Sequence, residues 1–246
     1  MSIAAIERAA EHSWPASERT TMGEWVLSAS DGFSRRRNSA VPAGQVTDSL
    51  EERLDAVTAW YTERKLPTLY RVTPLCDPRI DTVLDQRGFS IEDPVLVMVR
   101  ELPVDELSGR IVSLSVPTDG WAAIECEALG IDRTLFRPWL SAIRAVPQPA
   151  CFVIAMDGSR PVGAGFGAIS DGLLGVFEVA VLPDARLRGH ARRMMSALHS
   201  FGNRGGAEQA YLQVVEENDA AVDLYRSIGY EVSHRYWYRR ATVEGS

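Results

Sequence analysis

Four arginines crowd the predicted start of a helix, where positive charge is electrostatically unfavourable. They are Arg186, Arg188, Arg192 and Arg193, and the helix is predicted to begin near Gly189. The N-terminus of a helix carries partial positive charge, so each cation there costs about 0.3–1 kcal/mol. A bound anion would remove this conflict, because free backbone N–H groups and the helix dipole favour phosphate or pyrophosphate. A solvated basic turn is the alternative that the charges alone leave open.

A strand and a helix must position this basic turn. The segment from Leu173 to Val181 is short, apolar and rich in Val and Phe, which predicts a buried strand. Pro183 cannot continue a central strand, so the strand is predicted to end at Leu182-Pro183-Asp184. In the helix that follows, Gly189 and Ala191 are small enough to let a ligand approach the backbone closely.

Two motifs in this region resemble those of the GCN5-related N-acetyltransferases, the GNAT family. Arg186-x-x-Gly189-x-Ala191, after a strand that ends at Val179-Ala180-Val181, is similar to the acetyl-CoA-binding motif of that family. Downstream, Asn218-Asp219-Ala220-Ala221-Val222-Asp223-Leu224-Tyr225, followed by Gly229-Tyr230, is similar to the family segment N-x-x-A-x-x-L-Y-x-x-x-G-F/Y. The resemblance covers roughly residues 110 to 240. It implies an α/β protein with a mixed sheet, the GNAT acyl-CoA N-acyltransferase fold.

The resemblance also implies where acetyl-CoA, the cosubstrate, would bind. The pantetheine arm would hydrogen-bond to the main chain of Val179 and Val181, whose side chains can still pack in the core. Backbone N–H groups of the basic turn would hold the pyrophosphate, namely those of Arg186, Arg188, Gly189, His190, Ala191 and Arg192. His190 would supply its amide rather than act as a general base. Asn218 would begin the next helix, either capping it or contacting the cosubstrate.

Spacing and resemblance give Tyr225 different roles. Ala221, Leu224, Tyr225 and Ile228 share one helical face, which on its own predicts a core tyrosine. The family match implies instead that Tyr225 is a general acid. Attack of the amine on the thioester expels a thiolate, and a phenol with a pKa of about 10 can protonate it.

The sequence leaves the general base open. Some relatives carry a glutamate at the position of Gly175, and ribosomal-protein alanine acetyltransferases carry one at the position of Gln213. Glu178, Glu216 and Glu217 lie nearby, and a buried carboxylate with a raised pKa could serve. Glu178 ranks first. The alternatives are that it is a paired or exposed acid, and that a free amine reacts through water without a dedicated base.

Composition excludes several classes of protein. The chain has 246 residues, of which 46% are hydrophobic and 24% charged, as in an ordinary globular protein. Its net charge of −7 argues against non-specific nucleic-acid binding. Cys76, Cys126 and Cys151 form neither a zinc pattern nor a disulfide framework, which indicates a reducing, cytoplasmic setting without a metal. No apolar run reaches membrane-spanning length, and the N-terminus does not resemble a signal peptide.

The order of elements predicts two domains, 1–105 and 106–246, with a linker at 101–108. The first domain is expected to contain a helix over 3–24 that is interrupted by Pro15, strand 24–30, helix 49–65, strand 69–73, helix 77–87 and strand 95–99. Aligning Gly88-Phe89 with Gly229-Tyr230 places Leu84 where Tyr225 stands. The first half therefore resembles a smaller, degenerate GNAT-like α/β domain, as in tandem GNAT proteins such as mycothiol synthase. A generic strand–helix–strand unit is the alternative.

The second domain is expected to end with a single strand. Its predicted elements are strand 111–116, helices 119–129 and 133–143, strands 151–156, 161–170 and 173–181, the helix from Gly189, strand 208–215, the Asn218 helix and strand 231–240. Asp157-Gly158 and Asp171-Gly172 predict hairpin turns. Because the family usually ends with two strands, either the first half supplies the missing neighbour or the sheet is short.

These features favour an enzyme that moves the acetyl group of acetyl-CoA directly to a primary amine of a small molecule or peptide. The alternative is a catalytically inactive acyl-CoA-binding sensor or scaffold, which Gly175 and Gln213 favour and Tyr225 opposes. The acceptor amine is left open. A first half that only regulates the second, or that forms a homodimer, is compatible with either function.

Overall fold

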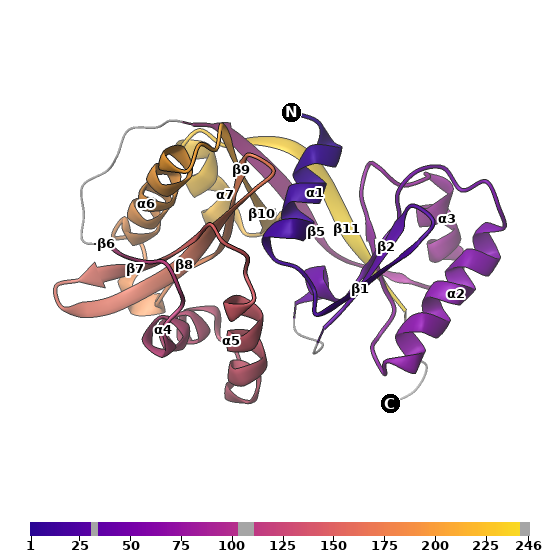
Figure 1. The fold of residues 1–246 in the computed structure, drawn as a ribbon, viewed down its shortest axis with the longest axis horizontal. Helices are drawn as coiled ribbons and strands as arrows, with labels where there is room; N and C mark the ends of the chain where they lie inside the picture. Colours follow the sequence, from indigo (N-terminus) through magenta and orange to yellow (C-terminus); the bar gives the residue numbers. More distant parts are fainter. Residues whose placement is uncertain (31–33, 103–110, 242–246) are drawn as a thin grey trace. The chain divides into compact units, whose positions relative to one another are not determined.

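The computed structural model describes residues 1–30, 34–102 and 111–241 (Figure 1). Contacts between Cα atoms divide the chain into two compact units, each made of segments that are separate in the sequence. Unit 1 comprises residues 1–15, 98–213 and 220–232, and unit 2 comprises residues 16–97, 214–219 and 233–246. The predicted linker at 101–108 falls mostly outside the described residues, and the predicted domains 1–105 and 106–246 stay a prediction.

Unit 1 is built on a mixed sheet in which the strand order is β5-β10-β9-β8-β7-β6. The strands are the end of β5 (Ser90–Glu101), β6 (Ile111–Leu114), β7 (Ala150–Asp157), β8 (Arg160–Ser170), β9 (Leu173–Val181) and β10 (Gln209–Val215). Neighbours from β6 to β9 pair antiparallel, whereas β10 pairs parallel with β9. Both predicted hairpins form, with positive φ at Gly158, Asp171 and Gly172.

Glycines on one face of β8 let helix α6 (His190–Arg204) approach the sheet closely. A Cβ atom on Gly163 would lie 3.2 Å from Cε of Met194, and one on Gly167 would lie 3.3 Å from Cδ2 of Leu198. Met194 and Leu198 are fully buried. Because alternate residues of a strand point to the same face, this face of β8 belongs to α6.

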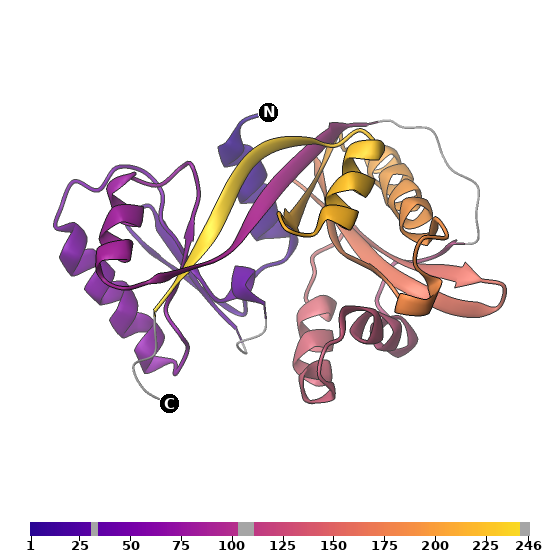
Figure 2. The same ribbon diagram turned by 180° about the vertical axis from the view of Figure 1, so that it is seen from behind.

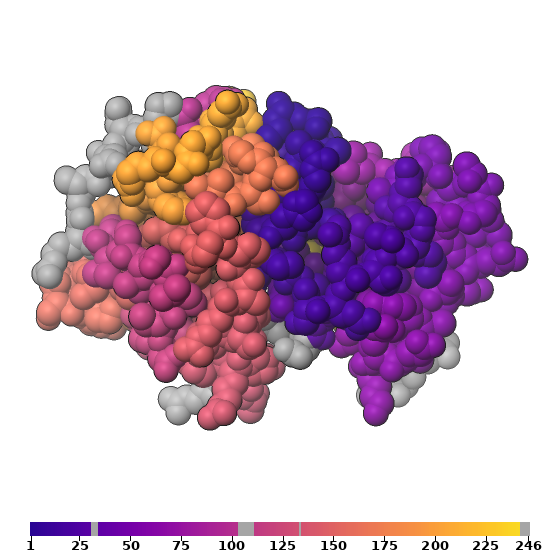
Figure 3. Space-filling view, viewed as in Figure 1, coloured from indigo at the N-terminus to yellow at the C-terminus, as the bar shows by residue number. Residues whose placement is uncertain are grey.

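The opposite face of β8 is filled by aromatic side chains. Phe166 of β8 stacks on Phe177 of β9, with ring centroids 5.1 Å apart. Trp14, just after α1 (Ile3–Ser13), and Trp121 of α4 (Asp119–Leu129) meet Phe166 edge-on. Trp121 also stacks on Trp139 of α5 (Phe136–Arg144). The outer sides of α4 and α5 form part of the surface in Figure 3.

Unit 2 contains a second set of strands, in the order β1-β2-β3-β4-β11-β5. They are β1 (Glu18–Met22), β2 (Trp25–Ala29), β3 (Ala40–Val41), β4 (Leu69–Val72), β11 (Glu231–Arg240) and the first part of β5. β11 lies between β4 and β5, and Figure 2 shows β5 and β11 side by side. Strands of the first half therefore supply the neighbours of the last strand, which is one of the two predicted outcomes.

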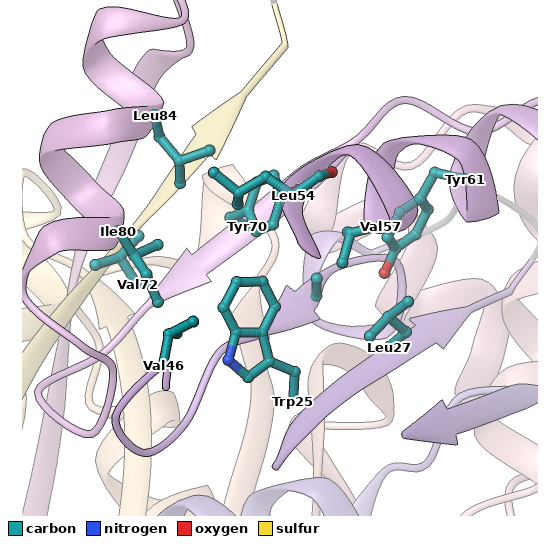
Figure 4. Close-up of a cluster of buried hydrophobic side chains, with 11 residues drawn as sticks. Trp25, Leu27, Val46, Leu54, Val57, Tyr61, Tyr70, Val72, Ile80 and Leu84 are labelled. Carbon is teal, nitrogen blue, oxygen red and sulfur yellow. The ribbon is translucent and has the colours of Figure 1, made fainter. Parts of the chain in front are cut away.

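The core of unit 2 lies between these strands and two helices, α2 (Leu50–Glu63) and α3 (Arg79–Gln86). Figure 4 shows its buried side chains, which include Trp25, Leu27, Val46, Leu54, Val57, Tyr61, Tyr70, Val72, Ile80 and Leu84. The remaining elements are the 3-10 helices η1 (Arg35–Arg37), η2 (Arg133–Leu135) and η3 (Pro183–Ala185), and α7 (Asp219–Ser227).

The N-terminal segment differs from its prediction. The helix predicted over residues 3–24, with its interruption at Pro15, is confirmed only in its first part: α1 ends at Ser13, and β1 then forms a hairpin with β2 around Gly23, where φ is +60°. Pro15 cannot continue a helix, and the β-branched pair Thr20-Thr21 favours a strand. The predicted strand 95–99 is also longer, since β5 begins at Ser90. The other predicted helices and strands form close to their expected bounds.

Candidate active site

β9 carries a β-bulge at Glu178. Its register with β8 shifts between Phe177 and Ala180, so that Glu178 and Val179 lie opposite Gly165 alone. Glu178 has a φ of +52°, a left-handed value that is uncommon for a residue with a side chain. A bulge bends its strand and re-aims the neighbouring side chains. The middle of β9 therefore departs from a regular strand at an acidic residue.

The bulge moves the side chains that follow it to the other face of the sheet. Phe177 points to the aromatic face, and in a regular strand Val179 and Val181 would point the same way. Instead, both valine side chains lie on the α6 face of the sheet. A Cβ atom added to Gly165 would lie 3.0 Å from Cγ2 of Val179, and one added to Gly163 would lie 3.2 Å from Cγ2 of Val181. Glu178 is the residue at which the alternation of β9 breaks.

β10 accompanies only the first part of β9. Among the described residues, the parallel pairing of the two strands ends at Val176 and Leu212, whereas β9 continues to Val181. The main chain of Val179 and Val181, which the sequence analysis assigns to the cosubstrate, lies in this continuation. On its other side the continuation stays paired with β8.

The chain turns sharply between β9 and α6. Leu187 and Gly189 have positive φ, +60° and +77°, and the Nε–H of Arg186 donates to the Val181 carbonyl at 3.1 Å. α6 begins at His190, and no side chain caps its first N–H groups. Residues 186–189 are exposed, so the uncapped N–H groups lie at an exposed helix start, where an anion is stabilised.

Two arginines of the turn are held by neighbouring side chains. Arg188 pairs with Asp157 at 3.2 Å, and Arg192 donates to the Oγ of Ser227 at 2.6 Å. The Asp157 carboxylate offsets part of the positive charge that makes this helix start unfavourable. Ala191, between the arginines, is half-buried.

His190 is poorly suited to act as a base. Its side chain is 4% exposed, and burial and the nearby Arg193 guanidinium lower its pKa. Arg193 donates to its Nδ1 at 2.8 Å, which requires that nitrogen to be unprotonated. The contribution of the His190 backbone amide to the cosubstrate site stays a prediction.

Tyr225 lies on α7 and is 9% exposed, so it occupies the core position that spacing predicts. Burial, and to a lesser extent the negative charge of Glu178, raise its pKa to about 12. The phenol is therefore protonated at neutral pH. The shared electrostatic interaction shows that Tyr225 and Glu178, the two predicted catalytic residues, lie near one another.

Asn218 directly precedes α7, and its N–H donates to the Val215 carbonyl at 3.0 Å. It belongs to unit 2, whereas Tyr225 belongs to unit 1. The contact of Asn218 with the cosubstrate stays a prediction.

Gly175, where some relatives carry a glutamate, has no room for a side chain. A Cβ atom there would lie 2.5 Å from the Tyr211 hydroxyl oxygen and 2.6 Å from the Phe177 ring. The Tyr211 hydroxyl in turn donates to the Oγ of Ser13 at 3.1 Å. Close packing therefore fixes glycine at this position, and the acid that β9 itself offers is Glu178.

One acid that the sequence analysis did not single out is fully buried. Glu125 of α4 is 0% exposed, and neither of its carboxylate oxygens has a hydrogen-bond partner among the described residues. Burial first, and the charge of Glu178 second, raise its pKa well above the ordinary 4.5. A signal was present in the sequence, because Glu125 follows Trp121 by four residues and therefore shares its apolar face.

Three further observations concern the described residues. No group of three or more His, Cys, Asp or Glu side chains within the described ranges could hold a metal ion. Of the helices that the structure describes, none has the length and apolar character needed to cross a membrane. Cys76, Cys126 and Cys151 are free thiols.

Comparisons with known proteins cover nearly the whole chain. A family model described as "Probable histone acetyltransferase Rv0428c C-terminal" matches residues 1–239. The chain is 24% identical over 243 residues to the "Uncharacterized N-acetyltransferase YobR" of Bacillus subtilis, covering 96% of this chain and 98% of that protein. It is 28% identical over 253 residues to the "Probable histone acetyltransferase Rv0428c" of Mycobacterium tuberculosis, covering 99% and 75% respectively.

A solved structure shares the fold. A "GCN5-related N-acetyltransferase from Kribbella flavida" superposes with a TM-score of 0.75 at 21% identity, covering 100% of this chain and 97% of that one.

Proposed function

We propose that this protein transfers the acetyl group of acetyl-CoA directly to a primary amine. The chain belongs to the family described as "Probable histone acetyltransferase Rv0428c C-terminal", and it is an acyltransferase with the GNAT fold. The predicted family and mixed α/β fold are confirmed. One observation carries the finer proposal: a bulged strand leads into an exposed turn with two left-handed residues, at the uncapped start of α6.

The donor would lie along the end of β9 and across this turn. The main chain of Val179 and Val181 would hydrogen-bond to the pantetheine arm, because β9 extends beyond its pairing with β10. The pyrophosphate would accept from the N–H groups of the turn, with Arg186 and Arg188 at its edge. A Cβ atom on Gly189 would lie 3.2 Å from Nη1 of Arg193, so a larger residue would crowd this turn.

Two side chains of unit 1, Glu178 and Tyr225, account for every proton transfer in the reaction. The Glu178 carboxylate takes one proton from the acceptor ammonium, and the free amine attacks the thioester carbonyl carbon, which backbone donors near Val179 polarise. The new C–N bond forms and the C–S bond breaks. Tyr225 gives its phenolic proton to the CoA thiolate, and the resulting phenolate takes the surplus proton of the new amide nitrogen.

The interaction of Glu178 with Tyr225 couples these two steps. The negative charge of Glu178 is one of the two causes that raise the Tyr225 pKa. When Glu178 takes a proton from the ammonium, that charge disappears and the Tyr225 pKa falls. The phenol thereby becomes a stronger acid as the thiolate leaves, which brings its pKa closer to that of the thiol it must protonate.

The alternative function is an acyl-CoA-binding sensor or scaffold without catalysis. The closely packed Gly175 favours it, because no carboxylate can stand at that position. Tyr225 and Glu178 oppose it, since binding alone needs neither a buried phenol nor an acid at the bulge.

The acceptor in this proposal is a small-molecule or peptide amine, and the setting is the cytoplasm. The free thiols of Cys76, Cys126 and Cys151 support a reducing compartment. Nucleic acid and membrane are not proposed as partners, and a homodimer is left open.

Two measurements test the proposal in order. Calorimetric titration with acetyl-CoA and with CoA should show binding in the micromolar range; absence of binding contradicts both functions. Release of CoA thiol from acetyl-CoA is then followed with a panel of primary amines. Thiol release that requires an amine supports the enzyme, whereas binding without release for any amine supports the sensor.

A further inference from the structure

α4 presents a buried face to the sheet of unit 1, and that face contains one acid. Its buried residues are Trp121, Ala122, Glu125, Cys126 and Ala128. The Nε1–H of Trp121 donates to the Val153 carbonyl of β7 at 3.0 Å, and this contact anchors the helix to the sheet. Because Glu125 lies one helical turn further on, its carboxyl is carried on the same side of α4.

The environment of Glu125 is unfavourable for a carboxyl group in the free protein. Both oxygens are buried without a hydrogen-bond partner among the described residues, and leaving a buried polar group unpaired destabilises the folded state. Such a group remains in a folded protein when it serves a purpose that packing alone does not supply. Burial, and after it the charge of Glu178, raise its pKa well above the ordinary 4.5, which favours the neutral form of the carboxyl group.

Glu178 is the charged group that faces Glu125 from the sheet. α4 packs against β7, β8 and β9. Within these strands the other charged residues, Asp157 and Arg160, flank the hairpin turn and pair with Arg188 and Asp184. On α5, Arg144 pairs with Asp119 at the start of α4. Glu178 is the remaining charged residue of these three strands, and its charge acts on Glu125.

Glu178 also links Glu125 to the reaction. It follows Phe177, whose ring lies on the aromatic face that α4 covers. Its charge acts on Glu125 and on Tyr225 alike. Glu178, which is half-buried, thus acts electrostatically on a buried acid and on the phenol that would protonate the thiolate.

Building on the proposed acetyl transfer, we propose that Glu125 and Glu178 together select an alkylammonium ion as the acceptor. The ion binds at Glu178, and Glu125 releases its proton to solvent as the ion arrives. One positive charge enters and one proton leaves, so the net charge of the site is unchanged by binding. Glu125 acts through Glu178 as a positioning residue, and its carboxylate holds the ammonium more strongly than Glu178 alone would.

The two carboxylates should distinguish charged from uncharged amines. An alkylamine is protonated at pH 7 and gains from the second carboxylate, whereas an arylamine such as p-toluidine is neutral and does not. Glutamine is a close isostere of a neutral carboxylic acid. If Glu125 stays neutral throughout, Glu125→Gln therefore leaves acceptor binding unchanged.

The experiment compares Glu125→Gln with Glu127→Gln, which removes an acid from the exposed side of the same helix. Acetyl-CoA affinity and steady-state kinetics are measured with spermidine, n-butylamine and p-toluidine. We expect Glu125→Gln to raise KM for the alkylamines at least tenfold, with unchanged acetyl-CoA affinity and unchanged p-toluidine kinetics. Unchanged alkylamine KM, or equal losses for all three amines, overturns the inference.

A second readout does not depend on turnover. The infrared C=O stretch of a neutral carboxylic acid should be present in the wild-type CoA complex at pH 7, absent in Glu125→Gln, and weakened when spermidine or n-butylamine is added. A band that neither alkylamine weakens overturns the inference. The proposed function fails differently, through absence of acetyl-CoA binding in the wild type.

Discussion

Helices α3 and α7, one in unit 2 and one ending in unit 1, finish in the same backbone conformation. The N–H of Phe89 donates to the Leu84 carbonyl at 3.0 Å, and the N–H of Tyr230 donates to the Tyr225 carbonyl at 3.0 Å. These are the pairs that the internal alignment of the sequence superposes. Each helix also connects two strands, β4 to β5 and β10 to β11. The local structure is repeated, while the tandem GNAT arrangement stays a prediction.

The two helix ends differ in the residue that could do chemistry. Gly88 and Gly229 both have positive φ, +79° and +87°, as a helix that ends in a left-handed residue requires. Leu84 is fully buried in the core of unit 2, whereas Tyr225 places a phenol beside an acidic strand bulge. The same backbone thus supports packing in one unit and a candidate acid in the other.

Removing the phenol tests whether this difference is catalytic. We expect Tyr225→Phe to lower kcat by about 10²–10⁴, the range for loss of a general acid, while acetyl-CoA affinity stays within about twofold because the ring remains. Stopped-time assays of CoA release at saturating amine measure it. Since the Tyr225 pKa is about 12, wild-type kcat should show no falling limb up to about pH 10.

Tyr61→Phe is the control in unit 2. The Tyr61 hydroxyl donates to the Ser28 carbonyl at 2.9 Å, so its loss should cost about 1 kcal/mol of stability without lowering kcat. A Tyr225→Phe variant with wild-type kcat would remove the catalytic distinction between the two helices.

The turn before α6 is the next feature to test. We expect Gly189→Glu to weaken acetyl-CoA binding about 100-fold, because a carboxylate would stand among the N–H groups that the pyrophosphate needs. Gly206→Glu is a matched control, since Gly206 has almost the same φ, +78° against +77°, just after the other end of α6. Calorimetry should show binding lost in the first variant and kept in the second. Equal loss in both would point to backbone strain instead.

Particular residues show what the sequence could and could not reveal. The hairpin turns at Asp157-Gly158 and Asp171-Gly172 follow from local residue types, and both are present. The bulge at Glu178 could not be predicted, because a two-against-one register depends on β8. Glu125 was overlooked because an acid on a helix is usually solvated, although its spacing from Trp121 placed it on the buried face.

Glu125 should also make stability depend on pH. Its folded pKa lies well above 4.5, so the folded protein keeps a proton that the unfolded chain releases. Stability is therefore lost as the pH rises from 4.5 toward the folded pKa, by up to about 1.4 kcal/mol per pH unit. Relative to wild type, Glu125→Gln should therefore gain stability in urea titrations as the pH rises above 4.5. Glu127→Gln, which is exposed, should gain nothing.

The smallest expected effect concerns the residue after each helix end. Tyr230→Phe places after α7 the same residue type that follows α3, where Phe89 stands. The Tyr230 hydroxyl lies 2.8 Å from Nε2 of His199 in a buried hydrogen bond, and burial lowers the His199 pKa to about 3, so the ring is neutral. Removal of the hydroxyl leaves Nε2 of His199 without this hydrogen-bond partner and should cost about 1 kcal/mol in urea titrations, with kcat unchanged. A large fall in kcat would extend the chemistry of this helix end beyond Tyr225.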